Sequence, residues 1–330
     1  PWTNSGTLGA DNGTLTLTNL GASTGPLQVD NGGTLNLSGT IQAAALNSLA
    51  PSGGGTTINI SGTVLNANGT LNFNAAKGVI NLVSGGRIVG GTVIIEGNFL
   101  NVTDGRFQDV VLGSDLTIRG GQSLRVAGAL TLDDSTVTLA GDSNGFAYLY
   151  ADGSAPWQIA GTGGIVLAGT NAQNQLGTGG AALTLGSGIT VTAPRGGTVN
   201  FGAGGINNAT IDIASTNPAF ITNLGGSNWI NRGTITATTG DVNVNELVSN
   251  EATFRVAGAT VDLNAGDGAA HVWTNDELLQ LDSGTLTLGG TLTTATLNSI
   301  DRPNDADRGT LRIAARIDNV MQFEKLKARV

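Results

Sequence analysis

The sequence predicts an all-β chain folded as a parallel β-helix, or β-solenoid, with about 19–25 residues per coil. Three observations lead to this fold class. Glycine makes up 52 of the 330 residues, a Gly-Thr-apolar triplet recurs along the chain, and a longer frame with a fixed asparagine returns at coil-like intervals. Helical periodicity is confined to two short segments, "NDELLQL" and "MQFEKLKARV".

The Gly-Thr-apolar triplet predicts the strands. Apolar and small polar residues alternate after most copies, as in "GTLTLTN" and "GTLNLSG", which is the pattern of a strand with one buried face. Glycine then allows a tight corner because it adopts positive φ without steric cost. The copies begin at Gly6, Gly13, Gly33, Gly39, Gly62, Gly69, Gly91, Gly197, Gly233, Gly284, Gly290 and Gly309.

A second pattern predicts that these strands belong to stacked coils. The frame large apolar, any, Asn, any, small, Thr, apolar starts at Trp2, Trp229 and Val248, and Trp273 begins it before the sequence departs. Recurrence at about 20–25 residues suits coils that bury their inner faces only by stacking. Asparagines at one corner can exchange amide hydrogen bonds at ~4.8 Å spacing. The predicted ladder consists of Asn4, Asn231, Asn250 and Asn275.

An antiparallel sandwich or meander is the competing fold. It would place Asn-Gly or Asp-Gly turns between paired strands, and such dipeptides begin at Asn12, Asn31, Asn68 and Asp104. These turns often precede a strand in the same phase as the previous one. The pattern therefore favours stacked coils.

A long internal repeat predicts how the coils are organised. Segments match at offsets of 251 to 253 residues, so residues 1–300 are expected to form a continuous solenoid holding one unit and the start of the next. Residues 301–330 are more charged and are expected to form the last coils or an end junction. Residues 27–66 match residues 279–319. The matching segments are Leu27–Asn31 and Leu279–Ser283, Gly33–Leu49 and Gly284–Ile300, and Thr57–Asn66 and Thr310–Asn319.

Three stretches carry a family resemblance: "GTVIIEGNFLNVTDGRFQDVVLGSDLTIRGG", "GSGITVTAPRGGTVNF" and "NWINRGTITATTGDVNV". They resemble the tandem repeats of giant secreted bacterial surface proteins with filamentous-haemagglutinin-like or autotransporter-passenger-like β-helical domains. The resemblance covers most of residues 1–319 and implies a right-handed β-helix that acts as an adhesin, fibre or stalk. It carries no catalytic motif.

The composition of the chain limits the classes of partner that we expect it to bind. The net charge is −9, with 15 basic and 24 acidic residues, and no basic stripe is interleaved with aromatics, so we expect no nucleic acid. The chain has no cysteine and therefore no disulfide or thiolate metal site. It begins at Pro1 and has neither a leader nor a long apolar stretch, so we expect no membrane span in this chain and a processed or excised segment of a longer protein.

Candidate catalytic and metal residues are few. His271 is the only histidine, which restricts any Ser-His-Asp triad to this residue, and a coil corner is the alternative. The acid pairs Asp133/Asp134 and Asp276/Glu277 are the minimum for glycoside hydrolysis, but neighbours on a strand point to opposite faces, which favours solvated corners as the alternative. We expect no enzyme and no cofactor, apart from a candidate calcium site whose oxygen ligands suit a hard cation. That site comprises Asp301, Asn304, Asp305 and Asp307.

Two surface features suggest carbohydrate as a partner. In "GFAYLYADG", the side chains of Phe146, Tyr148 and Tyr150 share one strand face, where exposed rings could stack on sugars. Stacking toward the core, or hydroxyls at the core edge, is the alternative for these rings. A polysaccharide-binding or polysaccharide-cleaving β-helix would combine acids with arginines in a groove, for which the candidates are Arg87, Arg106, Arg119 and Arg125.

The two ends of the chain differ in charge, which suggests self-association. Seven of the 15 basic residues fall in 301–330 and none in 1–30. Open solenoid ends template further pairing, so we expect head-to-tail stacking into a filament or tandem array. The candidate junction residues are Trp2, Arg312, Arg316, Lys325 and Lys327. The function expected overall is a structural or adhesive rod, secreted to the bacterial cell surface or an extracellular fibre.

Overall fold

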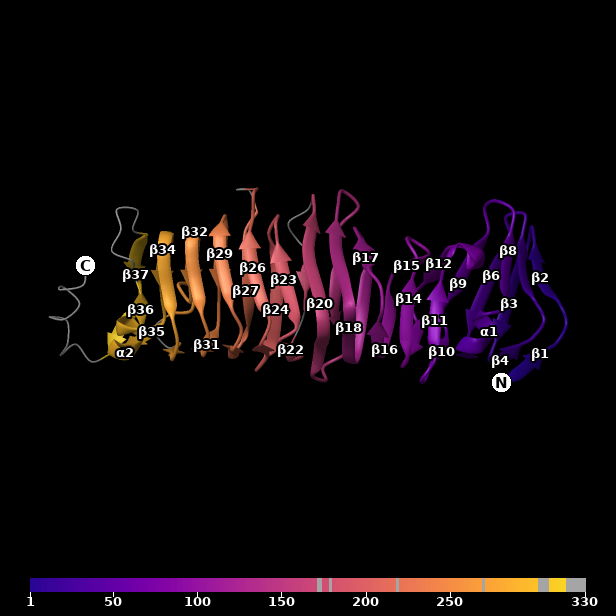
Figure 1. Cartoon of the computed structure of the whole chain (residues 1–330), viewed down its shortest axis with the longest axis horizontal. Coiled ribbons are helices and arrows are strands. Elements are labelled where there is room, and N and C mark those ends of the chain that lie inside the picture. The colour runs from indigo at the N-terminus through magenta and orange to yellow at the C-terminus, as the bar shows by residue number, and fades with distance from the viewer. Residues whose placement is uncertain (171–173, 178–179, 218–219, 269–270, 302–308, 319–330) are drawn as a thin grey trace.

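The computed structural model of the chain is a rod of stacked coils whose first and last described coils lie at opposite ends (Figure 1). It describes residues 1–330 except 171–173, 178–179, 218–219, 269–270, 302–308 and 319–330. The rod is a β-solenoid of about 13 turns with all-parallel sheets. The predicted fold class is therefore confirmed, and the antiparallel sandwich or meander is wrong.

Three faces run along the rod because each complete coil contributes a strand, or part of one, to each face. Face 1 contains β3 (Thr14–Thr18), β6 (Thr34–Ser38), β9 (Thr57–Ile60), β12 (Ile80–Leu82), β15 (Leu100–Val102), β17 (Leu116–Arg119), the last part of β18 (Ser123–Gly141), the last part of β20 (Trp157–Gly169), β23 (Ile189–Ala193), β26 (Thr210–Ala214), β29 (Ile235–Thr239), the first parts of β32 (Phe254–Leu263) and β34 (Leu279–Leu288), and β36 (Ile300–Asp301).

Faces 2 and 3 complete the coils. Face 2 contains β1 (Trp2–Asn4), β4 (Leu20–Ser23), β7 (Thr40–Gln42), β10 (Thr63–Leu65), β13 (Arg87–Val89), the first parts of β16 (Gly105–Leu112) and β18, β19 (Tyr148–Ala151), β21 (Gln175–Leu176), β24 (Gly197–Ala203), β27 (Thr222–Ser227), β30 (Asp241–Val244), the last parts of β32 and β34, and β37 (Thr310–Ile313). Face 3 contains β2 (Leu8–Asp11), β5 (Leu27–Asp30), β8 (Leu49–Ser52), β11 (Thr70–Phe73), β14 (Thr92–Ile95), the last part of β16, the middle of β18, the first part of β20, β22 (Leu183–Leu185), β25 (Ile206–Asn207), β28 (Trp229–Asn231), β31 (Leu247–Asn250), β33 (Thr274–Asn275), β35 (Thr291–Thr293) and β38 (Arg316–Asp318). The helical turns are α1 (Ala43–Leu46), η1 (Ala75–Lys77) and α2 (Thr294–Asn298).

Coil length varies more than the sequence predicted. Paired residues are 18 positions apart at Trp2 and Leu20 and 29 apart at Ala129 and Gln158. The longer coils carry longer corners, such as the turn before β19 that is closed by an antiparallel bridge between Asp142 and Gly145. Extra residues loop out at corners because the stacked strands keep their register.

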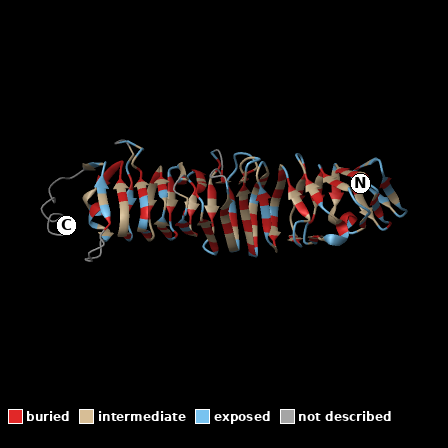
Figure 2. Cartoon of the chain, turned by 90° about the horizontal axis from the view of Figure 1, so that it is seen from above, coloured by how far each residue is buried: buried red, intermediate tan, exposed pale blue. Residues whose placement is uncertain are grey.

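The core follows from the period-two pattern. In β6, Leu35 and Leu37 are buried while the residues between them are half-buried. Figure 2 shows this alternation repeated along the length of the rod, so that buried positions form one continuous interior. Phe201 and Trp229 stack within it, with ring centroids 4.5 Å apart. No coil could exclude water from its inner face alone, so each depends on its neighbours.

The Asn-Gly dipeptides form corners of the solenoid. Asn12, Asn31 and Asn68 each have positive φ, between 48° and 58°, a conformation that asparagine tolerates better than most residues. Each lies between strands of different faces, so the chain turns toward the next face there and does not reverse as it would in a hairpin. The same dipeptides that suggested hairpins therefore serve a parallel fold.

A buried asparagine ladder joins four coils at the edge of face 3. Asn207 Nδ2 donates to Asn231 Oδ1 at 2.8 Å, and Asn231 Nδ2 donates to Asn250 Oδ1 at 2.6 Å. Asn250 Nδ2 continues the ladder to Asn275 Oδ1. These four side chains are at most 6% exposed, so their amides satisfy one another where water is excluded.

Asn4 does not join this ladder. Its Nδ2 donates to Ser23 Oγ at 3.0 Å in the first coils of the rod, far from Asn231. The Oδ1 atom of Asn4 accepts a hydrogen bond from the Gly6 amide two residues on, as Asn231 Oδ1 accepts from the Gly233 amide. The frame therefore predicts the local geometry of Asn4 correctly. It does not predict the partner in the next coil, where serine replaces asparagine.

A second ladder lies on the outside of face 1. Asn59 Nδ2 donates to Asn36 Oδ1, Asn81 to Asn59, and Asn101 to Asn81, at 3.0 to 3.1 Å. Arg119 Nη1 ends the series with a bond to Asn101 Oδ1 at 3.0 Å. These asparagines are half-buried, so the outer ladder is in contact with solvent.

One unit of the long sequence repeat does not span a whole number of coils. Continuous parallel pairing links β7 on face 2, coil by coil, to the last part of β34. By sequence, however, Thr40 in β7 matches Thr291 in β35, which lies on face 3. The small helices agree, since α1 follows β7 and α2 follows β35. One repeat unit therefore shifts equivalent segments by one face, or about a third of a turn.

Candidate functional site

An arginine column on face 2 is the clearest cluster of charge on the rod. Arg87, Arg106 and Arg125 occupy paired positions in three successive coils, and Tyr150 takes the same position in the fourth. The alternation of each strand turns these side chains outward while their neighbours pack inside. Like charges directly opposite on neighbouring strands repel, so this arrangement needs compensation.

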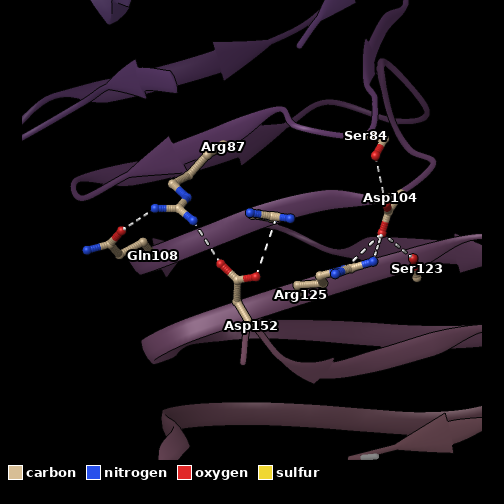
Figure 3. Close-up of polar contacts among 8 residues, drawn as sticks. Ser84, Arg87, Asp104, Gln108, Ser123, Arg125 and Asp152 are labelled. Carbon is tan, nitrogen blue, oxygen red and sulfur yellow. Dashed lines mark hydrogen bonds and ion pairs between the residues drawn. The ribbon is translucent and has the colours of Figure 1, made fainter. Parts of the chain in front are cut away.

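Two aspartates provide that compensation (Figure 3). Asp152 contacts Arg87 at 2.9 Å and Arg106 at 3.5 Å, and its side chain is only 13% exposed. Asp104 accepts from Nε of Arg125 at 2.9 Å and contacts its Nη2 at 2.9 Å. Three positive charges thus face two negative ones, and the cluster keeps a net charge of +1 within an acidic chain.

Neighbouring hydroxyls fix Asp104 in this role. Ser84 Oγ donates to its Oδ2 at 2.9 Å and Ser123 Oγ to its Oδ1 at 3.1 Å. Burial disfavours the charged carboxylate, but the hydrogen bond from Ser84 and the charge of Arg125 outweigh it and hold the pKa of Asp104 below its ordinary value. A carboxylate held in this way is a weak base.

The aromatic row lies beside the column. Phe146, Tyr148 and Tyr150 are half-buried and outward-facing, while Ala147 and Leu149 between them fill the core. The alternative that placed these rings toward the core is therefore wrong. The rings meet edge to face, with centroids 6.0 Å apart for Phe146 and Tyr148 and 6.3 Å for the two tyrosines.

Rings and charges together line a shallow groove of about 480 Å³. The guanidinium carbon of Arg125 lies 5.3 Å from the centre of the Tyr150 ring, which links the two sets of side chains by a cation–π contact. The groove is lined by Asp104, Gly121, Gln122, Ser123, Arg125, Phe146, Tyr148 and Tyr150. The structure thus brings together two candidate surfaces that the sequence had left separate.

Arg119 stands apart from the arginine column because it is held in the outer ladder of face 1. The acid pairs also fail to form a site among the described residues. Asp133, Asp276 and their neighbouring acids are exposed at corners. His271 is half-buried, and its Nε2 lies 2.9 Å from the Leu247 carbonyl oxygen, which is a contact between coils.

The calcium candidate falls mostly outside the described residues. Asp301 is exposed at the end of β36, whereas Asn304, Asp305 and Asp307 lie in the undescribed segment 302–308. Within the part of the chain that is described, no three histidine, cysteine, aspartate or glutamate side chains are grouped as metal ligands. Equally, none of the described helices has the length and apolar character needed to cross a membrane.

The candidate junction residues lie at both ends of the rod. Trp2 is 40% exposed, although its indole Nε1 donates to the Thr18 carbonyl at 2.9 Å. Trp229 and Trp273 make the same contact to a carbonyl 16 residues on and are fully buried. Arg312 and Arg316 are exposed in the last described coil. The remaining candidates, Lys325 and Lys327, lie outside the described residues.

Comparison with known proteins adds no relative to this picture: no family model, curated protein or solved structure matches the chain.

Several residues of the groove were not foreseen from the sequence. Asp104 appeared only in an Asp-Gly dipeptide, and neither Gln122 nor Asp152, which pairs with Arg87 beside the groove, carried a signal. The pairing of Arg87 with Asp152 joins residues 65 positions apart, across three coils of unequal length. One signal was available, since Arg87, Arg106 and Arg125 are spaced by 19 residues each, a plausible coil length.

Proposed function

We propose that this chain is a segment of a non-catalytic rod, secreted to a bacterial surface or an extracellular fibre, that holds adhesive groups away from the cell. The observation that carries the proposal is the uninterrupted core, which extends from Ala10 to Leu297. A core continuous over many coils resists bending because every coil is packed on both sides. The likeness of the sequence to filamentous-haemagglutinin-like and autotransporter-passenger-like repeats supports the same role.

Stacking between coils also supports head-to-tail association as part of this proposal. A coil placed before Trp2, in the same chain or in another molecule, would cover a ring whose counterparts are buried elsewhere. Burying that ring would contribute about 1.5–3 kcal/mol. Arg312 and Arg316 at the opposite end would meet an N-terminal region that has no basic residue.

Surface labelling of intact cells tests the location that this function requires. An antibody raised against the purified chain is expected to label unbroken cells that produce the protein, and added protease is expected to remove the label. A cytosolic protein of the same cells serves as the control for leakage. Labelling only after the cells are permeabilised would contradict the proposal.

A further inference from the structure

We propose that the groove on face 2 binds an anionic polysaccharide, with a sugar ring against Tyr148 and an acidic group of the sugar on Arg125. This inference rests on the proposed adhesive role and names the ligand class for it. It is carried by three features of the described residues: aromatic surface left exposed, an incompletely neutralised arginine column, and their meeting in one groove.

The aromatic surface is unusual for this chain. Only 4% of the residues are aromatic, and both tyrosines line this groove together with Phe146. Elsewhere large rings such as Trp229 and Trp273 are fully buried. Rings with half-exposed faces beside polar groups are suited to stacking on the apolar faces of sugars.

The arginine column supplies the charge. Stacking Arg87, Arg106 and Arg125 at the coil spacing brings like charges together. The one positive charge left over belongs to Arg87 and Arg106, which share Asp152 beside the groove, whereas Arg125 in the groove pairs with Asp104. Asp104 engages Nε and Nη2 of Arg125, and none of the described hydrogen bonds involves its Nη1. That nitrogen is available for a carboxylate or sulfate, which guanidinium binds in charge-assisted hydrogen bonds.

The shape of the groove favours a chain ligand. Its volume of about 480 Å³ falls within the usual range for small-molecule sites, and the arginine column continues from Arg125 to Arg106 and Arg87 in the two preceding coils. An extended polysaccharide bearing a charge on successive rings could therefore place several charges along Arg125, Arg106 and Arg87. A neutral polysaccharide would gain binding free energy only from stacking on the aromatic rings.

Isothermal titration calorimetry of the purified chain tests this inference. The probes are a hexagalacturonate, a heparin-derived hexasaccharide and neutral maltohexaose. We expect both acidic probes to bind, the neutral one to bind at least about tenfold more weakly, and added salt to weaken acidic binding. Hexagalacturonate carries carboxylates alone, whereas the heparin-derived probe carries carboxylates and sulfates, so tighter binding of the second probe would indicate that sulfate adds to the binding.

Matched variants assign the binding to the groove. Arg125→Gln and Tyr148→Ala are each expected to weaken hexagalacturonate binding by about tenfold or more, whereas Tyr148→Phe keeps the ring and should retain most affinity. Arg255→Gln is the control, because Arg255 pairs with Asp282 through the same two nitrogens, but among the described contacts it has no cation–π contact like that of Arg125 with Tyr150. Circular dichroism verifies that each variant remains folded.

Three results would overturn the inference: no saturable binding of either acidic probe, equal affinity for maltohexaose, or equal losses for Arg125→Gln and Arg255→Gln. None of these results would affect the surface labelling of intact cells. Failure of the glycan proposal would leave a structural rod without this ligand. Failure of surface labelling would instead reject the proposed role itself.

Discussion

Replacing Asn231 with alanine is expected to lower the free energy of unfolding by roughly 2–6 kcal/mol. The substitution leaves two buried partners unpaired, namely Asn250 Oδ1 and the Gly233 amide. It also removes one of the two bonds of Asn207 Nδ2, which still donates to the Ala209 carbonyl. Each unsatisfied buried group costs about 1–3 kcal/mol. Thermal and urea unfolding followed by circular dichroism would measure the loss.

The outer ladder provides the matched control. Asn59 also donates to one neighbouring coil and accepts from another, but it lies half-buried on the surface of the rod. Water can replace its partners after Asn59→Ala, so we expect a loss below about 1 kcal/mol. Similar losses for Asn59→Ala and Asn231→Ala would show that burial does not give the inner ladder its importance.

Substituting alanine for Gly202 is expected to cost about 2–5 kcal/mol. Its φ of +67° is unfavourable for a residue with a side chain, and an added Cβ would collide with the Ala181 carbonyl oxygen of the adjacent coil. The left-handed conformation costs about 1–2 kcal/mol, and overpacking against the fixed backbone about 1–3 kcal/mol. The same unfolding measurements would detect the loss as a lower melting temperature.

Two nearby glycines separate these causes. Gly204 has φ of +73° with no atom near the added Cβ, so Gly204→Ala should show the conformational cost alone, about 1 kcal/mol. Gly225 has neither a positive φ nor a close neighbour, and Gly225→Ala should change stability by less than about 0.5 kcal/mol. If Gly202→Ala and Gly204→Ala were equally destabilising, close approach of the coils would not explain Gly202.

The sequence predicts the coils of this protein better than their lateral contacts. Period-two alternation locates the strands, and the Trp-x-Asn frame places Asn231, Asn250 and Asn275 at one corner. It does not reveal the outer ladder, although an asparagine between two apolar residues recurs in "LNL", "INI" and "LNV". Polar residues at such positions are also expected on any half-exposed strand, so the pattern has no unique meaning.

The groove depends on coil lengths that no local pattern determines. The aromatic row is visible because its three rings alternate within one strand. The contact of Asp152 with Arg87 cannot be predicted from the sequence in this way. Predicting it requires knowing how many residues each intervening coil contains, including the long corner before β19. A coil length predicted wrongly by a few residues would assign another residue to the position opposite Arg125 that Tyr150 occupies.

The repeat carries a further structural consequence. Because one unit shifts equivalent segments from one face to the next, tandem units would present the same surface in turn on three sides of the rod. A groove repeated in this way would face several directions, which suits attachment to a surrounding matrix. Multiple grooves on one rod would also raise the overall avidity without any new contact.

Electron microscopy of the native assembly tests the central claim most directly. Material isolated from producing cells with the antibody is expected to consist of unbranched rods that diffract at ~4.8 Å along their axis. Where units of ~250 residues repeat, surface features should recur at roughly 55 Å and shift by one face each time. Compact particles without the ~4.8 Å reflection would contradict the account of this protein as a structural rod.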